Sequence, residues 1–112
     1  MDITVAQVDN TQVITLRGRL DSSTSAEFES QALGSLTADQ PRLVISFSEL
    51  NYISSAGLRV ILILAKKIRQ TQGRLALCEM SPAIREVFDI SGFLSILTVR
   101  NTQAEALAEI NL

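Results

Sequence analysis

Short apolar runs near the start of the chain predict a β-hairpin. Residues 3–8 and 13–16 have mostly β-branched side chains, which are typical of strands. The residues between them, Asp9-Asn10-Thr11, favour a turn. The second run leads into Arg17-Gly18-Arg19-Leu20-Asp21. We therefore expect Asp21 to lie at the end of a strand and just before a helix.

The next segments predict a helix and then a buried strand. Thr24 and Glu27 have the spacing of a capping box, so we expect a helix that begins near Ala26. Its buried face would carry Phe28, Ala32 and Leu36. The compact apolar run 41–47 is typical of a buried strand, and residues 48–53 would form a short loop after it.

A long amphipathic helix is predicted to follow Ser54-Ser55-Ala56-Gly57 and to close at Gln72-Gly73. The i, i+3, i+4 spacing predicts a buried stripe that consists of Leu58, Ile61, Leu62, Ala65 and Ile68. With that stripe inward, the residues that point outward are Arg59, Ile63, Lys66, Lys67 and Gln70, and Val60 lies at the rim.

The last third of the chain repeats the alternation of strand and helix. Residues 74–78 and 94–99 predict two strands, and between them Ser81 and Pro82 mark the start of a helix. Residues 102–105 have the spacing of a second capping box, which predicts a terminal helix.

The predicted elements follow the order ββαβαβαβα in a single domain, residues 1–112. Strands that alternate with helices favour a mixed, mainly parallel sheet with helices packed on it, because parallel neighbours need a crossover connection. The sequence therefore predicts an α/β fold.

Composition and charge exclude several classes of protein. Apolar residues make up 46% of the chain and charged residues 20%, which suits a globular core. The formal net charge is −2 and tryptophan is absent, so we expect no nucleic-acid partner, because such binding uses clustered Lys and Arg and stacking aromatics. The longest apolar run, residues 60–65, is too short to span a membrane. We expect a cytoplasmic protein that has no membrane partner.

The candidate chemistry argues against an enzyme. The chain has no histidine, which removes Ser-His-Asp and Cys-His nucleophiles and imidazole zinc sites. The single cysteine, Cys78, lies in a strand-like run and is interpreted as a small buried core residue. No carboxylate pair or phosphate-binding glycine loop stands out, so we expect no catalytic residue, no metal and no cofactor.

Ser54 and Ser55 stand where the segment after the third strand meets the long helix. A serine at this place is either an N-cap, which accepts a hydrogen bond from the first turn, or an acceptor for phosphate. A phosphate there would add close to two negative charges, which the helix dipole would favour. The spacing alone leaves both interpretations open.

Asp21 would lie at the same edge of the sheet as the two serines if their strands are neighbours. Function concentrates at this edge in open α/β sheets. The Asp21 carboxylate is then either a turn residue of the helix start or a neighbour of the acceptor. In the second case it would orient the hydroxyl for a kinase and later repel the phosphate.

The outward face of the long helix offers a docking surface. Ile63, flanked by basic residues, is either a partner anchor or an ordinary exposed apolar residue. Lys66, Lys67 and Arg69 are interpreted as a solvated face.

Four stretches resemble, in the right order, those of bacterial anti-sigma-factor antagonists, the STAS domain family. They are residues 16–21, 50–62, 78–83 and 87–93. The second is similar to the family's signature Asp-Ser-Ser/Thr-Gly-Leu-Gly-Val, with Ser54 in place of the aspartate and Arg59 in place of the second glycine. The resemblance covers almost the whole chain.

The resemblance implies a switch protein. In the family, the unphosphorylated antagonist binds an anti-sigma factor that is also an ATP-dependent serine kinase, and the sigma factor is released. Phosphorylation of a serine in this loop separates the complex, and a PP2C-type serine phosphatase restores the active form. Matched by position, the acceptor is Ser55, with Ser54 as second choice, and Asp21 falls on the family's acidic position. The expected partner contacts are Ser54, Ala56, Gly57, Arg59 and Ile63.

Two alternatives belong to other classes. The first is a STAS module without a switch, which serves as a scaffold or as a subunit of a stress-signalling or lipid-transport assembly. The second is a small nucleotide-binding module, which the lack of a glycine-rich phosphate loop disfavours.

Overall fold

The computed structural model describes residues 1–111, so the last residue of the expected domain, residue 112, lies outside the described part. The elements are β1 (Asp2–Val8), β2 (Thr11–Leu20), α1 (Ser25–Gly34), β3 (Arg42–Ile53), α2 (Ser55–Gln70), β4 (Arg74–Cys78), α3 (Pro82–Ile90), the 3-10 turn η1 (Phe93–Ser95), β5 (Val99–Arg100) and α4 (Gln103–Ile110). The predicted order of strands and helices is confirmed.

The five strands form one sheet in the order β1-β2-β3-β4-β5. The β1–β2 hairpin is antiparallel, and the other three neighbouring pairs are parallel. This is the mixed, mainly parallel sheet that the alternating pattern predicts, and the α/β fold class is confirmed.

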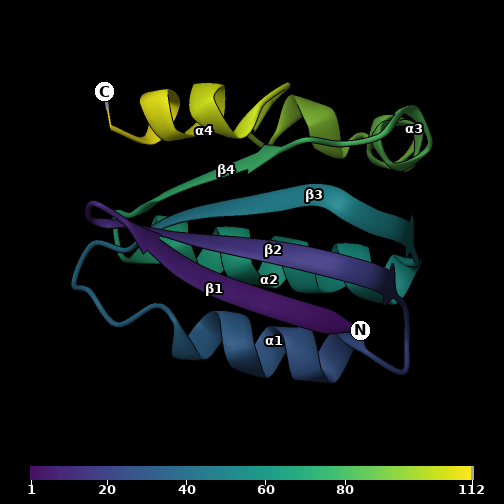
Figure 1. Ribbon diagram of the computed structural model, residues 1–112, viewed down its shortest axis with the longest axis horizontal. Coiled ribbons are helices and arrows are strands. Elements are labelled where there is room, and N and C mark those ends of the chain that lie inside the picture. The colour runs from purple at the N-terminus through teal and green to yellow at the C-terminus, as the bar shows by residue number, and fades with distance from the viewer. Residues whose placement is uncertain (112) are drawn as a thin grey trace.

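Helices cover both faces of the sheet. In Figure 1, α1 and α2 lie on one side and α4 lies on the other. The larger core joins β2 and β3 to α1, α2 and α3, and it includes an edge-to-face contact between Phe47 and Phe88 with ring centroids 5.7 Å apart. The smaller core lies under α4 and contains Cys78. Cys78 is fully buried, which confirms it as a core residue, and this burial raises the pKa of its thiol to about 11.

β3 is longer than the sequence predicts. Residues 48–53 were expected to form a loop, but they continue the strand to Ile53. The pairing of β2 with β3 shifts register twice, after Thr15 and after Gly18, and then continues to the pair Leu20–Ile53. Each irregularity changes the local direction of the strand, and within residues 48–53 Leu50 and Ile53 are buried in the core while the residues between them are exposed.

The predicted last strand, residues 94–99, is mostly wrong. Gly92 adopts a left-handed φ of 80° after α3, and Phe93–Ser95 form a 3-10 turn. Only Val99–Arg100 pair with β4. Leu94 and Leu97 pack against the core without strand hydrogen bonds. Their apolar side chains therefore reflect packing on the core and not a strand conformation.

One of the two predicted capping boxes is confirmed. Thr102 and Glu105 form a complete capping box at α4. Thr24 precedes α1 but makes no side-chain cap. Its hydroxyl instead donates to the Arg19 carbonyl at 2.9 Å and accepts from the Asp21 N–H at 2.9 Å, so it closes the turn between β2 and α1.

The buried stripe of α2 is wider than predicted. Val60, which was placed at the rim, and Leu64 are buried, whereas Leu62 and Ala65 are half-buried. The cause is packing on two sides, because α2 contacts α1 as well as the sheet. Residues 58–64 are apolar except for Arg59, so periodicity alone does not fix which arc faces inward.

α2 ends in a Schellman motif with an unusual residue at its left-handed position. The Gly73 N–H donates to the Ile68 carbonyl at 2.8 Å and the Gln72 N–H to the Arg69 carbonyl at 3.0 Å. Gln72 has a φ of 60°. A non-glycine residue there costs about 1 kcal/mol.

Gln72→Gly is therefore expected to raise the free energy of unfolding by about 0.5–1 kcal/mol, measured by urea denaturation. The control is Gln70→Gly in the last helical residue, which is expected to lower it because glycine is a poor helix former. Equal destabilisation by both variants would contradict the assignment of strain to Gln72.

Candidate functional site

The candidate site forms where β2 and β3 end side by side. Leu20 and Ile53 are sheet partners, and the Ser54 N–H donates to the Leu20 carbonyl at 2.9 Å. Asp21 and Ser54 therefore leave the sheet together. This confirms the expectation that both loops open at one edge of the sheet.

The two serines have different environments in the structure. Ser54 is the N-cap of α2, and its hydroxyl accepts from the Gly57 N–H at 3.3 Å. Ser54 is half-buried, whereas Ser55, the first residue of the helix, is exposed. Within residues 1–111 the Ser55 hydroxyl has no hydrogen-bond partner, so it is available to another molecule.

Gly57, one of the expected partner contacts, is buried in the first turn of α2. A Cβ at Gly57 would lie 2.7 Å from Leu20 Cγ and 3.0 Å from Ile53 Cγ1. Glycine lets the first turn of α2 approach the strand ends closely. The absence of a side chain at Gly57 thus helps to set where Ser54 and Ser55 lie relative to the strand ends.

The Asp21 carboxylate is held by its own turn. It accepts from the Ser23 hydroxyl at 2.7 Å and from the Ser23 N–H at 3.0 Å, and it lies 3.8 Å from Arg19 Nε. The hydrogen bonds from the Ser23 hydroxyl and then the Ser23 N–H lower the pKa of Asp21. In the described part of the chain it makes no hydrogen bond to Ser54 or Ser55, so its predicted orienting contact is not present.

The lowered pKa of Asp21 gives a prediction for acid unfolding. A carboxylate whose pKa is lower in the folded state contributes stability above its unfolded pKa of about 3.9 and loses it as pH falls through the folded pKa. The free energy of unfolding of Asp21→Asn should therefore be lower than that of the original protein at pH 6. The difference between the two proteins should shrink toward pH 3. Urea denaturation at both pH values measures it, and a constant difference would contradict the assignment.

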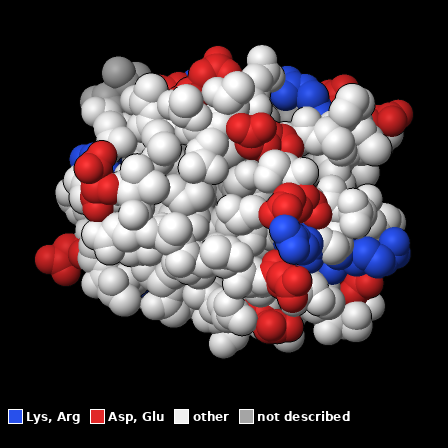
Figure 2. Space-filling model, in the orientation of Figure 1, with Lys and Arg blue, Asp and Glu red and all other residues white. Residues whose placement is uncertain are grey.

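Residues beside the serines form a second exposed surface, which the sequence interpretation missed. The Arg19 guanidinium stacks over the Tyr52 ring, 4.2 Å from its centroid, and Tyr52 is 41% exposed. Next to this pair, Arg17 and Glu49 form an ion pair at 2.6 Å. Figure 2 shows charged side chains of both signs gathered over the carboxyl ends of β2 and β3. An exposed tyrosine and arginine are residue types that dominate protein interfaces.

A shallow groove lies between α1 and α2 next to Ser55. It has a volume of about 170 Å³, and its lining residues are Ser25, Ala26, Glu29, Ala56, Arg59, Val60 and Ile63. The structure thus brings together three of the predicted partner contacts, Ala56, Arg59 and Ile63. Ile63 was expected to be fully exposed but is half-buried, so it forms part of the groove wall rather than a projecting anchor.

Two general features of the described residues bear on the class of site. No helix in residues 1–111 is both long and apolar enough to cross a membrane. The same residues contain no cluster of three or more metal-ligating side chains.

Comparisons with known proteins point to one family. The family model described as "STAS domain" matches residues 2–106. The chain is 43% identical over 108 residues, 96% of this chain and 93% of the relative, to BtrV, a proposed anti-sigma factor antagonist of Bordetella bronchiseptica. It is 31% identical over 101 residues, 89% of this chain and 86% of the relative, to an anti-sigma F factor antagonist of Paenibacillus polymyxa.

A solved structure shows the same fold. SpoIIAA, a Bacillus cell fate determinant solved in its phosphorylated form, superposes with a TM-score of 0.74 at 23% identity, over 97% of this chain and 99% of the other. The match of the family model over nearly all of the sequence, together with the two relatives and the shared fold, leads to one conclusion: the chain belongs to the STAS domain family.

Proposed function

We propose that this protein is an anti-sigma-factor antagonist that binds its anti-sigma factor through the N-terminal end of α2 and is switched off by phosphorylation of Ser55. The observation that carries the proposal is the exposed hydroxyl of Ser55 beside a neighbouring serine that is fixed as the helix cap. The names of the two relatives support the antagonist role.

Ser55 fits a kinase substrate better than Ser54. A kinase must place the acceptor hydroxyl in its own active site, and Ser55 presents a free hydroxyl at the surface. Ser54 is half-buried and its hydroxyl oxygen already accepts from the Gly57 N–H, so its hydroxyl is less accessible to a kinase than that of Ser55.

The switch follows from charge placed in an interface. The phosphate carries close to two negative charges, and the first turn of a helix tolerates them, so the antagonist itself stays folded. A partner that covers Ser55 would bury these charges without a compensating group. Burying an unpaired charge costs several kcal/mol, enough to separate the complex.

The proposed partners follow from this cycle. The anti-sigma factor acts as an ATP-dependent serine kinase on Ser55, and a PP2C-type serine phosphatase removes the phosphate. The proposed partner surface consists of the α1–α2 groove, which Ala56 next to Ser55 helps to line, and the Arg19–Tyr52 pair. This cycle places the protein in the cytoplasm.

Peptide mass mapping after incubation with the kinase and ATP tests the acceptor. We expect phosphate on Ser55 in the original protein, continued phosphorylation in Ser54→Ala, and none in Ser55→Ala. The kinase is obtained by capture from native lysate with Ser55→Ala as bait. Phosphate on Ser54 alone, or unchanged incorporation in Ser55→Ala, would contradict the proposal.

A STAS module without a switch remains the competing function. It predicts that Ser54→Ala and Ser55→Ala leave regulation unchanged and that kinase and ATP add no phosphate to either serine. The mass-mapping experiment therefore separates the two functions.

A further inference from the structure

A second groove lies at the opposite end of α2 from Ser55. It runs between the C-terminal half of the helix and residues 96–98, which were expected to form a strand. Since η1 replaces the first part of that strand, the sheet is short at this edge and one flank of α2 is left uncovered. The groove is thus a consequence of the local fold and is separate from the site described above.

The larger hollow of this groove is mainly apolar, and the smaller one also has polar walls from Gln72 and Thr98. Its two adjoining hollows, about 480 and 330 Å³ in volume, share Ala65, Arg69, Ile96 and Leu97. Leu62 extends the apolar wall at one end, and Leu75 extends it at the other. Ile96 is 57% exposed although it is large and apolar. Volumes of this order are typical of pockets for small organic ligands.

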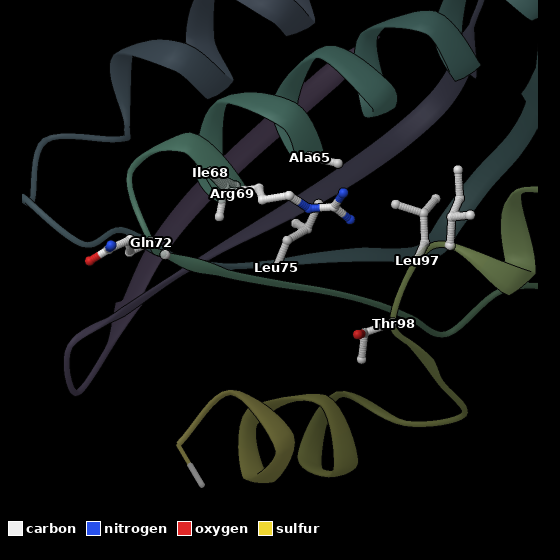
Figure 3. A pocket seen from close by; sticks show the side chains of 9 residues that line it. Ala65, Ile68, Arg69, Gln72, Leu75, Leu97 and Thr98 are labelled. Atoms are coloured by element: carbon white, nitrogen blue, oxygen red, sulfur yellow. The ribbon is translucent and has the colours of Figure 1, made fainter.

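All the charge that lines the groove is positive. Lys66 and Arg69 are its charged residues, and neither forms an ion pair with another residue in the described part of the chain. In Figure 3, the Arg69 side chain extends across the groove toward the side of Leu97. The positive charge contrasts with the formal net charge of −2 for the chain.

We propose that this groove binds a medium-chain fatty acid, with the carboxylate at Arg69 and Lys66 and the alkyl tail along Leu62, Ala65, Ile96 and Leu97. A guanidinium binds a carboxylate through two parallel hydrogen bonds. When the alkyl tail binds, it covers the apolar wall, including the exposed part of Ile96, and this removal of apolar surface from water favours binding.

The size of the groove favours a single alkyl chain over a docked peptide helix. An α-helix with its side chains is about 10 Å across, and two adjoining hollows of this volume do not accommodate several of its turns. A small inorganic anion would use the two cations but leave the apolar wall uncovered. A fatty acid satisfies both features with one molecule.

The test is a titration of the ¹⁵N-labelled full chain with decanoate, followed by NMR. We expect saturable shifts at Ala65, Arg69 and residues 96–98, and weaker binding of octanoate by up to about fifteenfold because it lacks two methylenes. Lys66→Gln combined with Arg69→Gln should weaken decanoate binding at least tenfold. Lys67→Gln, an exposed control on the same helix, should stay within twofold.

Three results would overturn the proposal. Equal binding of decyltrimethylammonium, which has the same tail and the opposite charge, would show that the groove does not select an anion. Unchanged decanoate affinity in the double variant would remove the proposed head-group contacts. Shifts with an acidic amphipathic peptide and none with decanoate would assign the groove to a protein instead. These three outcomes concern the groove alone. The proposal that Ser55 is phosphorylated is tested separately by mass mapping.

Discussion

Replacement of Ser55 by aspartate is expected to weaken binding of the anti-sigma factor by about a thousandfold. The carboxylate brings a negative charge to the centre of the proposed interface, and a loss of about 4 kcal/mol corresponds to that factor. An acidic residue in the first turn of a helix stabilises the helix itself. The Ser55→Asp protein should therefore keep its melting temperature while it loses its partner.

Two controls make the binding result specific. Ser55→Ala removes the hydroxyl without adding charge and should bind within a few fold of the original protein. Thr37→Asp adds the same charge to an exposed loop before β3, at the other end of the sheet, and should leave affinity unchanged. Calorimetric titration measures all three. Tight binding by Ser55→Asp, or an equal loss in Thr37→Asp, would refute the charge argument.

Gly57→Ala is expected to lower the free energy of unfolding by about 1–3 kcal/mol, although alanine is the better helix former. The new methyl would lie 2.7 Å from Leu20 Cγ and 3.0 Å from Ile53 Cγ1. Both neighbours are buried and have no free space to move into. Relief of the clash would push the first turn of α2 away from the sheet and displace Ser55.

Gly34→Ala is the matched control for this substitution. Gly34 also lies in a helix, but a Cβ there would meet no atom within 4 Å. Its replacement should leave stability unchanged or raise it slightly. Urea denaturation compares the two variants. If Gly57→Ala proves as stable as Gly34→Ala, the close packing of α2 on the strand ends is not what makes glycine necessary at residue 57.

The sequence predicts the framework of the fold because most of its elements carry strong local signals. Ser81 caps α3 as expected, its hydroxyl accepting from the Ile84 N–H at 3.2 Å, and β4 occupies the predicted residues 74–78. The end of β3 was missed because residues 48–53 do not alternate regularly between apolar and polar, and their strand conformation depends on pairing with β2.

The candidate site was predicted in part. The shared edge of Asp21 and the two serines follows from the alternation of strands and helices, so topology alone places it. The choice between the serines does not follow from topology, because it depends on which hydroxyl meets the Gly57 N–H. The Arg19–Tyr52 stack also depends on register within the extended strand. An exposed tyrosine close to the paired serines was the available signal.

The burial of Gly57 shows a further limit of interpretation by residue pattern. A glycine in a functional loop suggests surface contact, but here its lack of a side chain matters on the inner side of the helix. The distinction requires the distance to Leu20, which the sequence does not contain.

The most direct test of the account is the affinity of the anti-sigma factor for this protein before and after enzymatic phosphorylation. Phosphate on Ser55 should weaken binding at least as strongly as aspartate, and treatment with a PP2C-type phosphatase should restore the original affinity. Equal affinity of the unmodified and the fully Ser55-phosphorylated protein would contradict the proposed switch.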